Sequence, residues 1–267
     1  MKYKLMKPIT LTAFAALLLI SFPAFAQRAQ FRALLFTKTA GYHHESIHAG
    51  VAALKAMAER HMFAVQWEES ARVFTDAGLE NYHVIIFLNT TRDILNDEQQ
   101  QAMEKFIRSG KGFVGIHAAA DTEYDWEWYT RLVGRMFRTH PEIQTARLNV
   151  VNDNFPGMEL WPSSRLWTDE WYQYGEEKTE GLQYLLSVDE KTYDPKVVRN
   201  DQTLFEGMGD FHPISWYQEF DGGRAFYTGL GHVPATFSDP AFLDHLLGGI
   251  YWAATGKGLS AASAKSN

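Results

Sequence analysis

Short apolar runs alternate with segments of helical spacing through the first half of the chain. The run His83–Leu88 is almost entirely apolar, which is typical of a strand buried on both faces. Asn96 followed by Gln99 predicts a capping box at the start of a helix, and Gly110 predicts its end. Strands that alternate with helices predict right-handed crossovers and a parallel sheet. The predicted elements here are strands at 31–37, 63–67, 83–88 and 113–116 and helices at 46–61, 96–109 and 126–133.

The pattern changes after Pro141. Residues 145–151 alternate between apolar and polar, which favours a strand with one exposed face. The last segment, 239–254, has the spacing of an amphipathic helix. The predicted fold class is therefore α/β, with a mainly parallel sheet flanked by helices and extra β elements in the C-terminal half. Further strands are expected at 183–188, 196–199 and 224–230.

The segment Lys111–Ala120 (KGFVGIHAAA) predicts a buried strand that ends in a sharp turn into a helix. In α/β enzymes such an elbow presents one side chain above the sheet. In glutamine amidotransferases that residue is a nucleophilic Cys. Here it is His117, and the chain contains no Cys, so thiol chemistry is excluded. A histidine at this place can bind a metal or move a proton.

Ligands of open α/β sheets bind beyond the carboxyl ends of the strands. Thr37 ends a predicted strand at that edge, and Asn89, His117 and His232 follow predicted strands there. His232 comes directly after a Gly-x-Gly turn, so we expect it to face His117 across the edge.

Other polar residues are candidates for the site, and for each of them a structural role is the open alternative. His44 is either a ligand in the site or part of a polar helix start beside His43. The acids in Asp169–Tyr172 (DEWY) either serve the site or are buried acids paired with Arg135 or Arg138. His61, His83, His212 and His245 are interpreted as structural or surface residues.

Three histidines and a carboxylate match the ligand set of catalytic zinc, and other divalent metals are compatible with it. The long spacing matches no local metal motif such as HExxH, so the sequence leaves metal binding open. The Gly-rich pieces lack the strand–GxGxxG–helix context, and no P-loop motif exists, so we expect no nucleotide cofactor.

The first 26 residues are predicted to be a signal peptide. Lys2, Lys4 and Lys7 precede an apolar run at 11–22, and Ala24-Phe25-Ala26 fits a cleavage site. No Cys follows for a lipid anchor, so a soluble periplasmic or secreted protein without membrane insertion is expected. One domain at 27–258 and a flexible tail at 259–267 complete the predicted organisation.

Removal of three leader lysines changes the formal net charge from −7 to −10. An acidic chain argues against nucleic acid and against anionic membrane surfaces as partners. The sequence leaves the oligomeric state open. The 8 Trp and 12 Tyr suit stacking on sugars, although aromatic residues also fill cores.

Five ordered motifs resemble the ThuA-like family, which is named for trehalose utilisation. The family has the flavodoxin-like, class I glutamine amidotransferase-like fold and is associated with catabolism of trehalose and related disaccharides through 3-keto sugars. The resemblance covers about residues 32–256. One departure is Ala118, where the family usually has a small polar residue. The motifs are GYHHESI (41–47), GFVGIH (112–117), GRMFRTHP (134–141), DEWY (169–172) and GH (231–232).

The resemblance implies one shared polar pocket formed by His44, His117, His140, Glu170 and His232. Within this pocket, we assign His117, His232 and Glu170 to catalysis. The same three residues and His44 are assigned as ligands of a divalent metal, for which zinc is the first candidate. His44 and His140, together with Asp121, Trp126 and Tyr172, are assigned to substrate binding.

Three functions fit these assignments. The first is a lyase- or hydrolase-type enzyme acting on a keto-glycoside, in which His117 or His232 is the base and Glu170 a ligand or second acid. The second is a non-catalytic sugar-binding or pathway-accessory protein that binds through aromatic residues such as Trp126 and Tyr172. The third is a degenerate amidotransferase partner that docks on another subunit.

Overall fold

The computed structural model describes residues 29–175 and 180–258. The predicted leader at 1–26 and the tail from 259 lie outside the described residues. In the described part, no helix is both long and apolar enough to cross a membrane.

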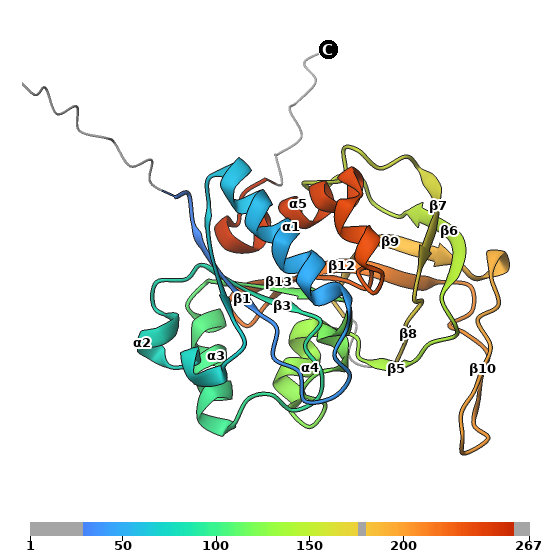
Figure 1. Cartoon of the computed structure of the whole chain (residues 1–267), viewed down its shortest axis with the longest axis horizontal. Coiled ribbons are helices and arrows are strands. Elements are labelled where there is room, and N and C mark those ends of the chain that lie inside the picture. The colour runs from blue at the N-terminus through green and yellow to red at the C-terminus, as the bar shows by residue number, and fades with distance from the viewer. Residues whose placement is uncertain (1–28, 176–179, 259–267) are drawn as a thin grey trace, which may run out of the picture.

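A single nine-stranded sheet runs through both halves of the described chain (Figure 1). The first five strands in space are parallel, and each of the last four is antiparallel to its neighbours. In spatial order they are β2 (Ala64–Glu68), β1 (Arg32–Phe36), β3 (Val84–Leu88), β4 (Gly112–Ile116), β13 (Gly223–Thr228), β12 (His212–Phe220), β9 (Gln183–Asp189), β6 (Gln144–Val150) and β7 (Ser164–Asp169).

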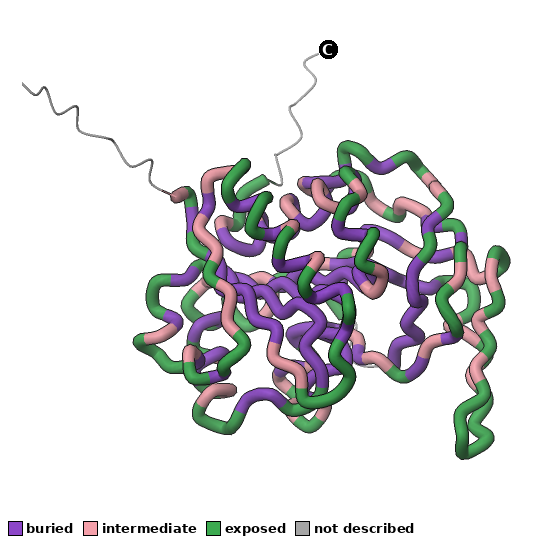
Figure 2. Tube along the Cα trace, viewed as in Figure 1, coloured by how far each residue is buried: buried purple, intermediate pink, exposed green. Residues whose placement is uncertain are grey.

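Helices cover both faces of the parallel half (Figure 1). Leu35, Ile86 and Val114 point to the face covered by α1 and α5, and their neighbours Leu34, Ile85 and Phe113 point to the face of α2, α3 and α4. Every residue of β3 and β4 is buried, so this part of the sheet is the purple centre of Figure 2. The helices are α1 (Ser46–His61), α2 (Asp76–Leu79), α3 (Asp97–Arg108), α4 (Glu127–Val133) and α5 (Pro240–Thr255).

Local sequence signals explain where these elements begin and end. The capping box predicted at Asn96 and Gln99 is present at the start of α3. Asp239 caps α5 by accepting hydrogen bonds from two backbone N–H groups, and Gly256 ends it in the left-handed conformation. The strands predicted at 31–37, 83–88, 113–116, 145–151, 183–188 and 224–230 are confirmed within one or two residues.

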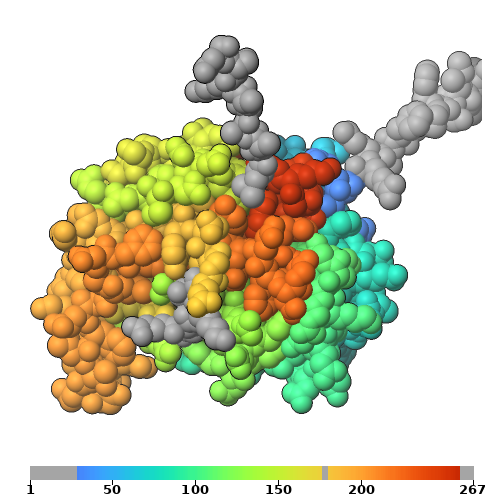
Figure 3. Space-filling model, turned by 180° about the vertical axis from the view of Figure 1, so that it is seen from behind, coloured from blue at the N-terminus to red at the C-terminus, as the bar shows by residue number. Residues whose placement is uncertain are grey.

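Two small sheets and several 3₁₀ turns complete the fold. The pair β5 (Phe137–Thr139) and β8 (Gln173–Tyr174) lies below the antiparallel half, and β10 (Val197–Val198) with β11 (Leu204–Phe205) forms a hairpin that projects from the domain (Figures 1 and 3). The 3₁₀ turns are η1 (Ala71–Val73), η2 (His117–Asp121), η3 (Glu190–Thr192) and η4 (Pro234–Ser238).

The elbow after β4 leads into η2, a single short 3₁₀ turn, and a longer helix after the elbow was not found. The chain leaves the turn because Arg92 N–H donates to Asp121 O, and a parallel bridge then joins Arg92 to Thr122. These contacts pull the segment back into extended backbone before α4 begins.

Candidate metal and active site

His117 occupies a strained elbow at the carboxyl end of β4. Its φ is +48°, which is uncommon for a residue other than glycine. The ring is fully buried, and its Nδ1–H donates to Gly229 O at 2.8 Å. Because Nδ1 carries the proton, the lone pair of the neutral ring is on Nε2, which faces His232 and Glu170.

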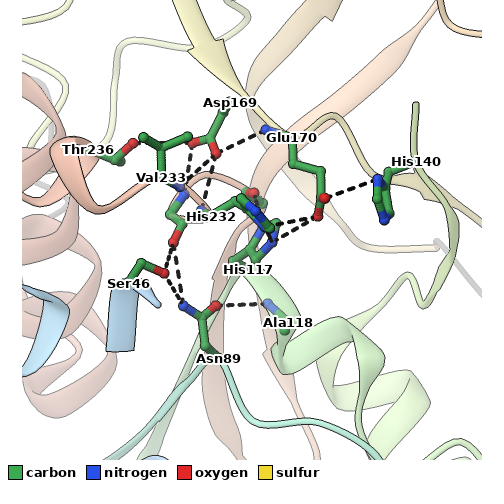
Figure 4. A network of polar contacts seen from close by, with 12 residues as sticks. Ser46, Asn89, His117, Ala118, His140, Asp169, Glu170, His232, Val233 and Thr236 are labelled. Atoms are coloured by element: carbon green, nitrogen blue, oxygen red, sulfur yellow. Dashed lines mark hydrogen bonds and ion pairs between the residues drawn. The ribbon is translucent and has the colours of Figure 1, made fainter. Parts of the chain in front are cut away.

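Asp169 fixes the loop that carries His232 (Figure 4). Its carboxylate accepts hydrogen bonds from the backbone N–H groups of Gly231, His232 and Val233 at 3.0–3.3 Å. Gly231 has a φ of +120°, which other residues rarely adopt. The buried Asp169 therefore holds the turn that directs His232 toward His117.

A second hydrogen-bond chain ties this loop to the start of α1. Ser46 Oγ donates to Gly231 O at 2.8 Å, and Asn89 Nδ2 donates to Ser46 Oγ at 2.8 Å (Figure 4). Since His44 lies two residues before Ser46, these bonds bring it against the elbow. Its ring centroid lies 5.1 Å from that of His117 and 5.2 Å from that of His232.

Four side chains converge on one point. Glu170 Oε2 lies 3.1 Å from His232 Nδ1 and 3.4 Å from His117 Nε2, and the two ring nitrogens are 3.2 Å apart. With one nitrogen of His44, all four candidate ligand atoms lie within 4.8 Å of one another. This is the ligand set predicted from the sequence.

The electrostatics of the cluster favour a cation. Burial, with smaller contributions from the neighbouring His117 and His232, lowers the pKa of His44 to about 2, so His44 is neutral. Although burial alone would raise the pKa of Glu170, contacts with His117, His140 and His232 hold it well below its usual range. The cluster therefore combines the ionised carboxylate of Glu170 with the neutral ring of His44.

The donor set and spacing fit a tetrahedral or five-coordinate metal. Zinc–nitrogen and zinc–oxygen bonds of about 2.0–2.2 Å place neighbouring ligand atoms roughly 3.3–3.5 Å apart. The edges formed by His117, His232 and Glu170 are close to this value. In addition, His44 Nδ1 is buried without a hydrogen-bond partner, and the Nδ1–H of His117 makes the outer hydrogen bond that orients metal-binding histidines.

His140 lies beside the cluster and contacts Glu170 from the other side. Its Nδ1 is 3.0 Å from Glu170 Oε1 and 2.9 Å from Pro141 O, so Nδ1 carries the proton and Nε2 the lone pair of the neutral ring. The side chain is 40% exposed. Although burial alone would lower the pKa of His140, Glu170 raises it above its ordinary value.

The other predicted binding residues take different places. Tyr172 is buried, and its ring lies 4.2 Å from that of His117, so it forms the wall behind the elbow. Asp121 ends η2 and is hydrogen-bonded to Tyr124. Trp126 does not join them, because its indole N–H donates to Glu104 on α3 and its ring stacks on Trp128. The interpretation of Glu170 as an acid paired with arginine is replaced by its three histidine contacts, and Arg135 is hydrogen-bonded to Tyr184.

Sequence reasoning gave no role to Tyr42, and it placed Asn89 at the edge of the sheet without assigning it a contact. Tyr42 is 62% exposed and packs edge-on against His44, with 4.8 Å between centroids, so it presents an aromatic face beside the cluster. Asn89 Oδ1 accepts from Ala118 N–H at 3.3 Å. In elbow hydrolases the N–H after the nucleophile forms the oxyanion hole. That group is engaged here, so the geometry suits metal and proton chemistry better than acyl transfer.

Comparisons with known proteins agree with this fold. The family model of ThuA, described as trehalose utilisation, matches residues 32–253. No curated protein sequence matches the chain. A ThuA-like protein from Bacteroides uniformis is similar over 89% of this chain and 98% of its own, with a TM-score of 0.71 and 22% identity.

Two further solved structures are similar at lower scores. A ThuA-like protein from Parabacteroides merdae has a TM-score of 0.66 and 19% identity over 85% of this chain and 91% of its own. A β-galactosidase from Bacillus circulans sp. alkalophilus has a TM-score of 0.52 and 13% identity over 82% of this chain and 30% of its own. At these identities the likenesses show the fold, a flavodoxin-like, glutaminase-like sheet flanked by helices, as the sequence predicted.

Proposed function

Because the chain belongs to the ThuA family, which is implicated in trehalose utilisation, we propose that it is a metal-assisted enzyme acting on a keto sugar. The single observation that carries this proposal is the cluster of His44, His117, Glu170 and His232, whose ligand atoms lie within 4.8 Å of one another. Zinc is the metal that suits three imidazoles and one carboxylate best.

In a 3-keto-glycoside, the carbonyl acidifies the proton on the neighbouring carbon. A divalent ion, when bound, would stabilise negative charge that develops on the carbonyl oxygen. His117 and His232 then use their free nitrogens as ligands, so neither remains for the substrate. His140 is the histidine of the site whose Nε2 is free to accept the carbon-bound proton.

The remaining side chains serve orientation. The exposed ring of Tyr42 offers a face on which a sugar ring can stack. Glu170 contacts His232 through Oε2 and His140 through Oε1, so it holds the proposed base beside the proposed metal ligands. Elimination, hydration or isomerisation of the keto sugar is the reaction class that follows from proton removal next to a carbonyl.

The two alternative functions receive less support from the geometry. A sugar-binding protein that relies on aromatic stacking would use exposed rings, but Trp171 is fully buried and Trp126 packs against α3 and α4. A subunit-docking role would need a contiguous apolar patch, and the exposed large apolar side chains of the described residues come from different segments, among them Leu166 on β7 and Val198 on β10.

Elemental analysis of the purified protein tests the proposal. We expect about one equivalent of zinc or another transition metal in the wild type and none in a His117→Ala/His232→Ala variant. His43→Ala is the matched control, because His43 is exposed and lies next to His44. Metal-loaded protein is then assayed on 3-keto-disaccharides. Absence of metal from the wild type, even after incubation with excess zinc, contradicts the proposed site.

We also propose export through the leader at 1–26. The support is the pattern of lysines, apolar run and small residues at the predicted cut after Ala26. N-terminal sequencing of the protein recovered from a periplasmic fraction should begin at Gln27. An unprocessed N-terminus in a cytoplasmic fraction contradicts it.

A further inference from the structure

Asn89 follows the carboxyl end of β3 and lies among the three segments that carry the histidines of the metal cluster (Figure 4). The residue is fully buried. Its φ is +51°, in the left-handed region that Asn adopts more readily than most residues other than glycine. The backbone N–H of Asn89 donates to Ile116 O at 3.2 Å, so the residue is also attached to the strand that leads into the elbow.

The side-chain amide of Asn89 is hydrogen-bonded to all three of these segments. Its Oδ1 accepts from Ala118 N–H at 3.3 Å, and its Nδ2 donates to Ser46 Oγ at 2.8 Å and to Gly231 O at 3.4 Å. The partners share one feature, since each lies one or two residues from a candidate ligand: Ala118 follows His117, Gly231 precedes His232, and Ser46 is two residues after His44.

These partners together require a neutral amide. Ala118 N–H can only donate and Gly231 O can only accept, which directs the amide oxygen toward Ala118 and the amide nitrogen toward Gly231. The one hydrogen of the Ser46 hydroxyl goes to Gly231 O, so its oxygen is left to accept from Asn89. A carboxylate at this position would lose both donors, and an aliphatic side chain would remove the acceptor of a buried N–H group.

The other polar side chains that brace the site act on fewer segments. Asp169 on β7 accepts from the backbone N–H of His232 at 3.1 Å, and Tyr227 on β13 donates its hydroxyl hydrogen to His117 O at 2.8 Å. Each of these contacts links two segments, whereas Asn89 links three ligand-bearing segments through one short side chain. Displacement of any of the three therefore strains a hydrogen bond of the same amide, which couples the distances between the imidazole rings.

We propose that Asn89 is the positioning residue that sets the distances among the imidazole rings of His44, His117 and His232. It acts through Ser46 and through the backbone of the elbow and of the Gly231 turn, so the rings are in place before a metal ion or a substrate arrives. The inference rests on the proposed function in that it takes these histidines as the metal ligands. The arrangement of the rings can nevertheless be measured without metal.

NMR of the metal-free protein with isotope-labelled histidine, at one fixed neutral pH, measures this arrangement. Asn89→Gly removes the amide and keeps a residue that adopts positive φ readily. We expect the ring signals of all three cluster histidines to shift, because their centroids are only 5.1–5.2 Å apart and each ring lies in the ring-current field of the others. The buried His212 and His245 are internal references whose signals should stay in place.

Gln218→Ala is the matched control for this experiment. The buried amide of Gln218 donates to Arg131 O and Leu132 O on α4, so its loss should leave the three cluster signals unchanged. If Asn89→Gly does not fold, Asn89→Asp gives the same test, because it fills the same space and cannot supply both donors. Unchanged cluster signals in the Asn89 variant, or equal shifts of the reference signals, overturn the inference.

Metal binding provides a second measurement. The zinc affinity of Asn89→Gly, from competition with a chelating dye, should fall by roughly 10- to 100-fold, as is typical of partners outside the ligand set. With cobalt in place of zinc, the visible absorption bands should change in position and intensity, because they depend on the geometry of the ligands. Wild-type affinity together with wild-type cobalt bands in the variant overturns the positioning role. Absence of metal binding by the wild type is the separate sign that the proposed function has failed, and the ring signals then decide the inference by themselves.

Discussion

Two buried groups of histidine and glutamate contact Tyr172, one at its ring through His117 and one at its backbone carbonyl through His212, and they differ in how completely their atoms are partnered. His212 Nδ1 lies 2.7 Å from Glu190 Oε1, and His212 Nε2–H donates to Tyr172 O at 2.7 Å. Glu190 also accepts from the N–H groups of Met208 and Gly209. This pair is a closed structural unit, because each ring nitrogen faces an acceptor.

In the group around Glu170, by contrast, ring nitrogens face each other or lack a hydrogen-bond partner. There His117 Nε2 faces His232 Nδ1 at 3.2 Å, and His44 Nδ1 is buried with no hydrogen-bond partner. These nitrogens lie beside the Glu170 carboxylate, and a divalent cation is the ligand that we propose for them. The comparison teaches that residue types alone do not mark a metal centre, whereas the count of donors and acceptors does.

The largest expected effect comes from breaking the open group at its centre. His117→Ala removes a ligand and the ring that faces both His232 and Glu170. We expect zinc affinity to fall by more than about 100-fold, beyond the 10- to 100-fold typical of outer partners. Competition with a chelating dye measures this change, and His43→Ala serves as the control. Unchanged affinity would remove His117 from the site.

Asp169→Asn tests the support behind the ligands. The variant leaves all four candidate ligands in place but turns one acceptor of the Gly231–Val233 loop into a donor. We expect zinc affinity to fall by roughly 10- to 100-fold, because His232 loses its fixed direction. An affinity equal to that of the wild type would show that the loop is held without Asp169.

Glu190→Ala breaks the closed group formed by His212 and Glu190. It should lower the stability of the fold without changing metal binding at the group around Glu170. Removal of the carboxylate leaves His212 and two backbone N–H groups without their acceptor, which should lower the free energy of unfolding by about 2 kcal/mol. Metal content should stay the same. Chemical denaturation and elemental analysis of the same sample check both parts, and a joint loss of stability and metal would mean that the two groups are coupled.

His245 offers a test without any metal or carboxylate partner, since it also has an unpartnered Nδ1 but lies between the rings of Trp161 and Phe226. Burial lowers its pKa to about 3. The unfolded chain takes up this proton below about pH 6.5, so His245 makes stability fall as the pH drops from about 6.5 toward 3, by about 1.4 kcal/mol per pH unit.

The variant His245→Gln should show a shallower loss of stability with acid over the same range. In the wild type, His245 Nε2 lies 2.9 Å from Ser215 Oγ. The side-chain amide of Gln can donate a hydrogen bond to the same oxygen. Urea unfolding at a series of pH values measures the two slopes. Parallel slopes in wild type and variant would show that His245 is not held neutral.

The sequence predicted those elements whose signals are local. The apolar run of β3 and the capping box of α3 lie within single segments, and both were found where expected. Strand β12 was missed, because it mixes Pro213, Ser215 and Gln218 with apolar residues and is stabilised by strands distant in sequence. Its register shifts next to Pro213, so no regular alternation marks it.

The site was predictable where topology alone places a residue. His117 and His232 follow neighbouring parallel strands, so their meeting follows from the strand order. Asp169 and Glu170 could not be told apart, because adjacent residues at a strand end point to opposite sides and only the structure shows which side holds the histidines. The direction of Trp126 depends on packing against α3, which no local pattern encodes.

The most direct test of the metal centre is anomalous diffraction at the zinc absorption edge from crystals of zinc-loaded protein. We predict one peak between His44, His117, Glu170 and His232, about 2.0–2.2 Å from their ligand atoms. A map with no peak among these four side chains, or with its only peak elsewhere on the protein, would contradict the assignment.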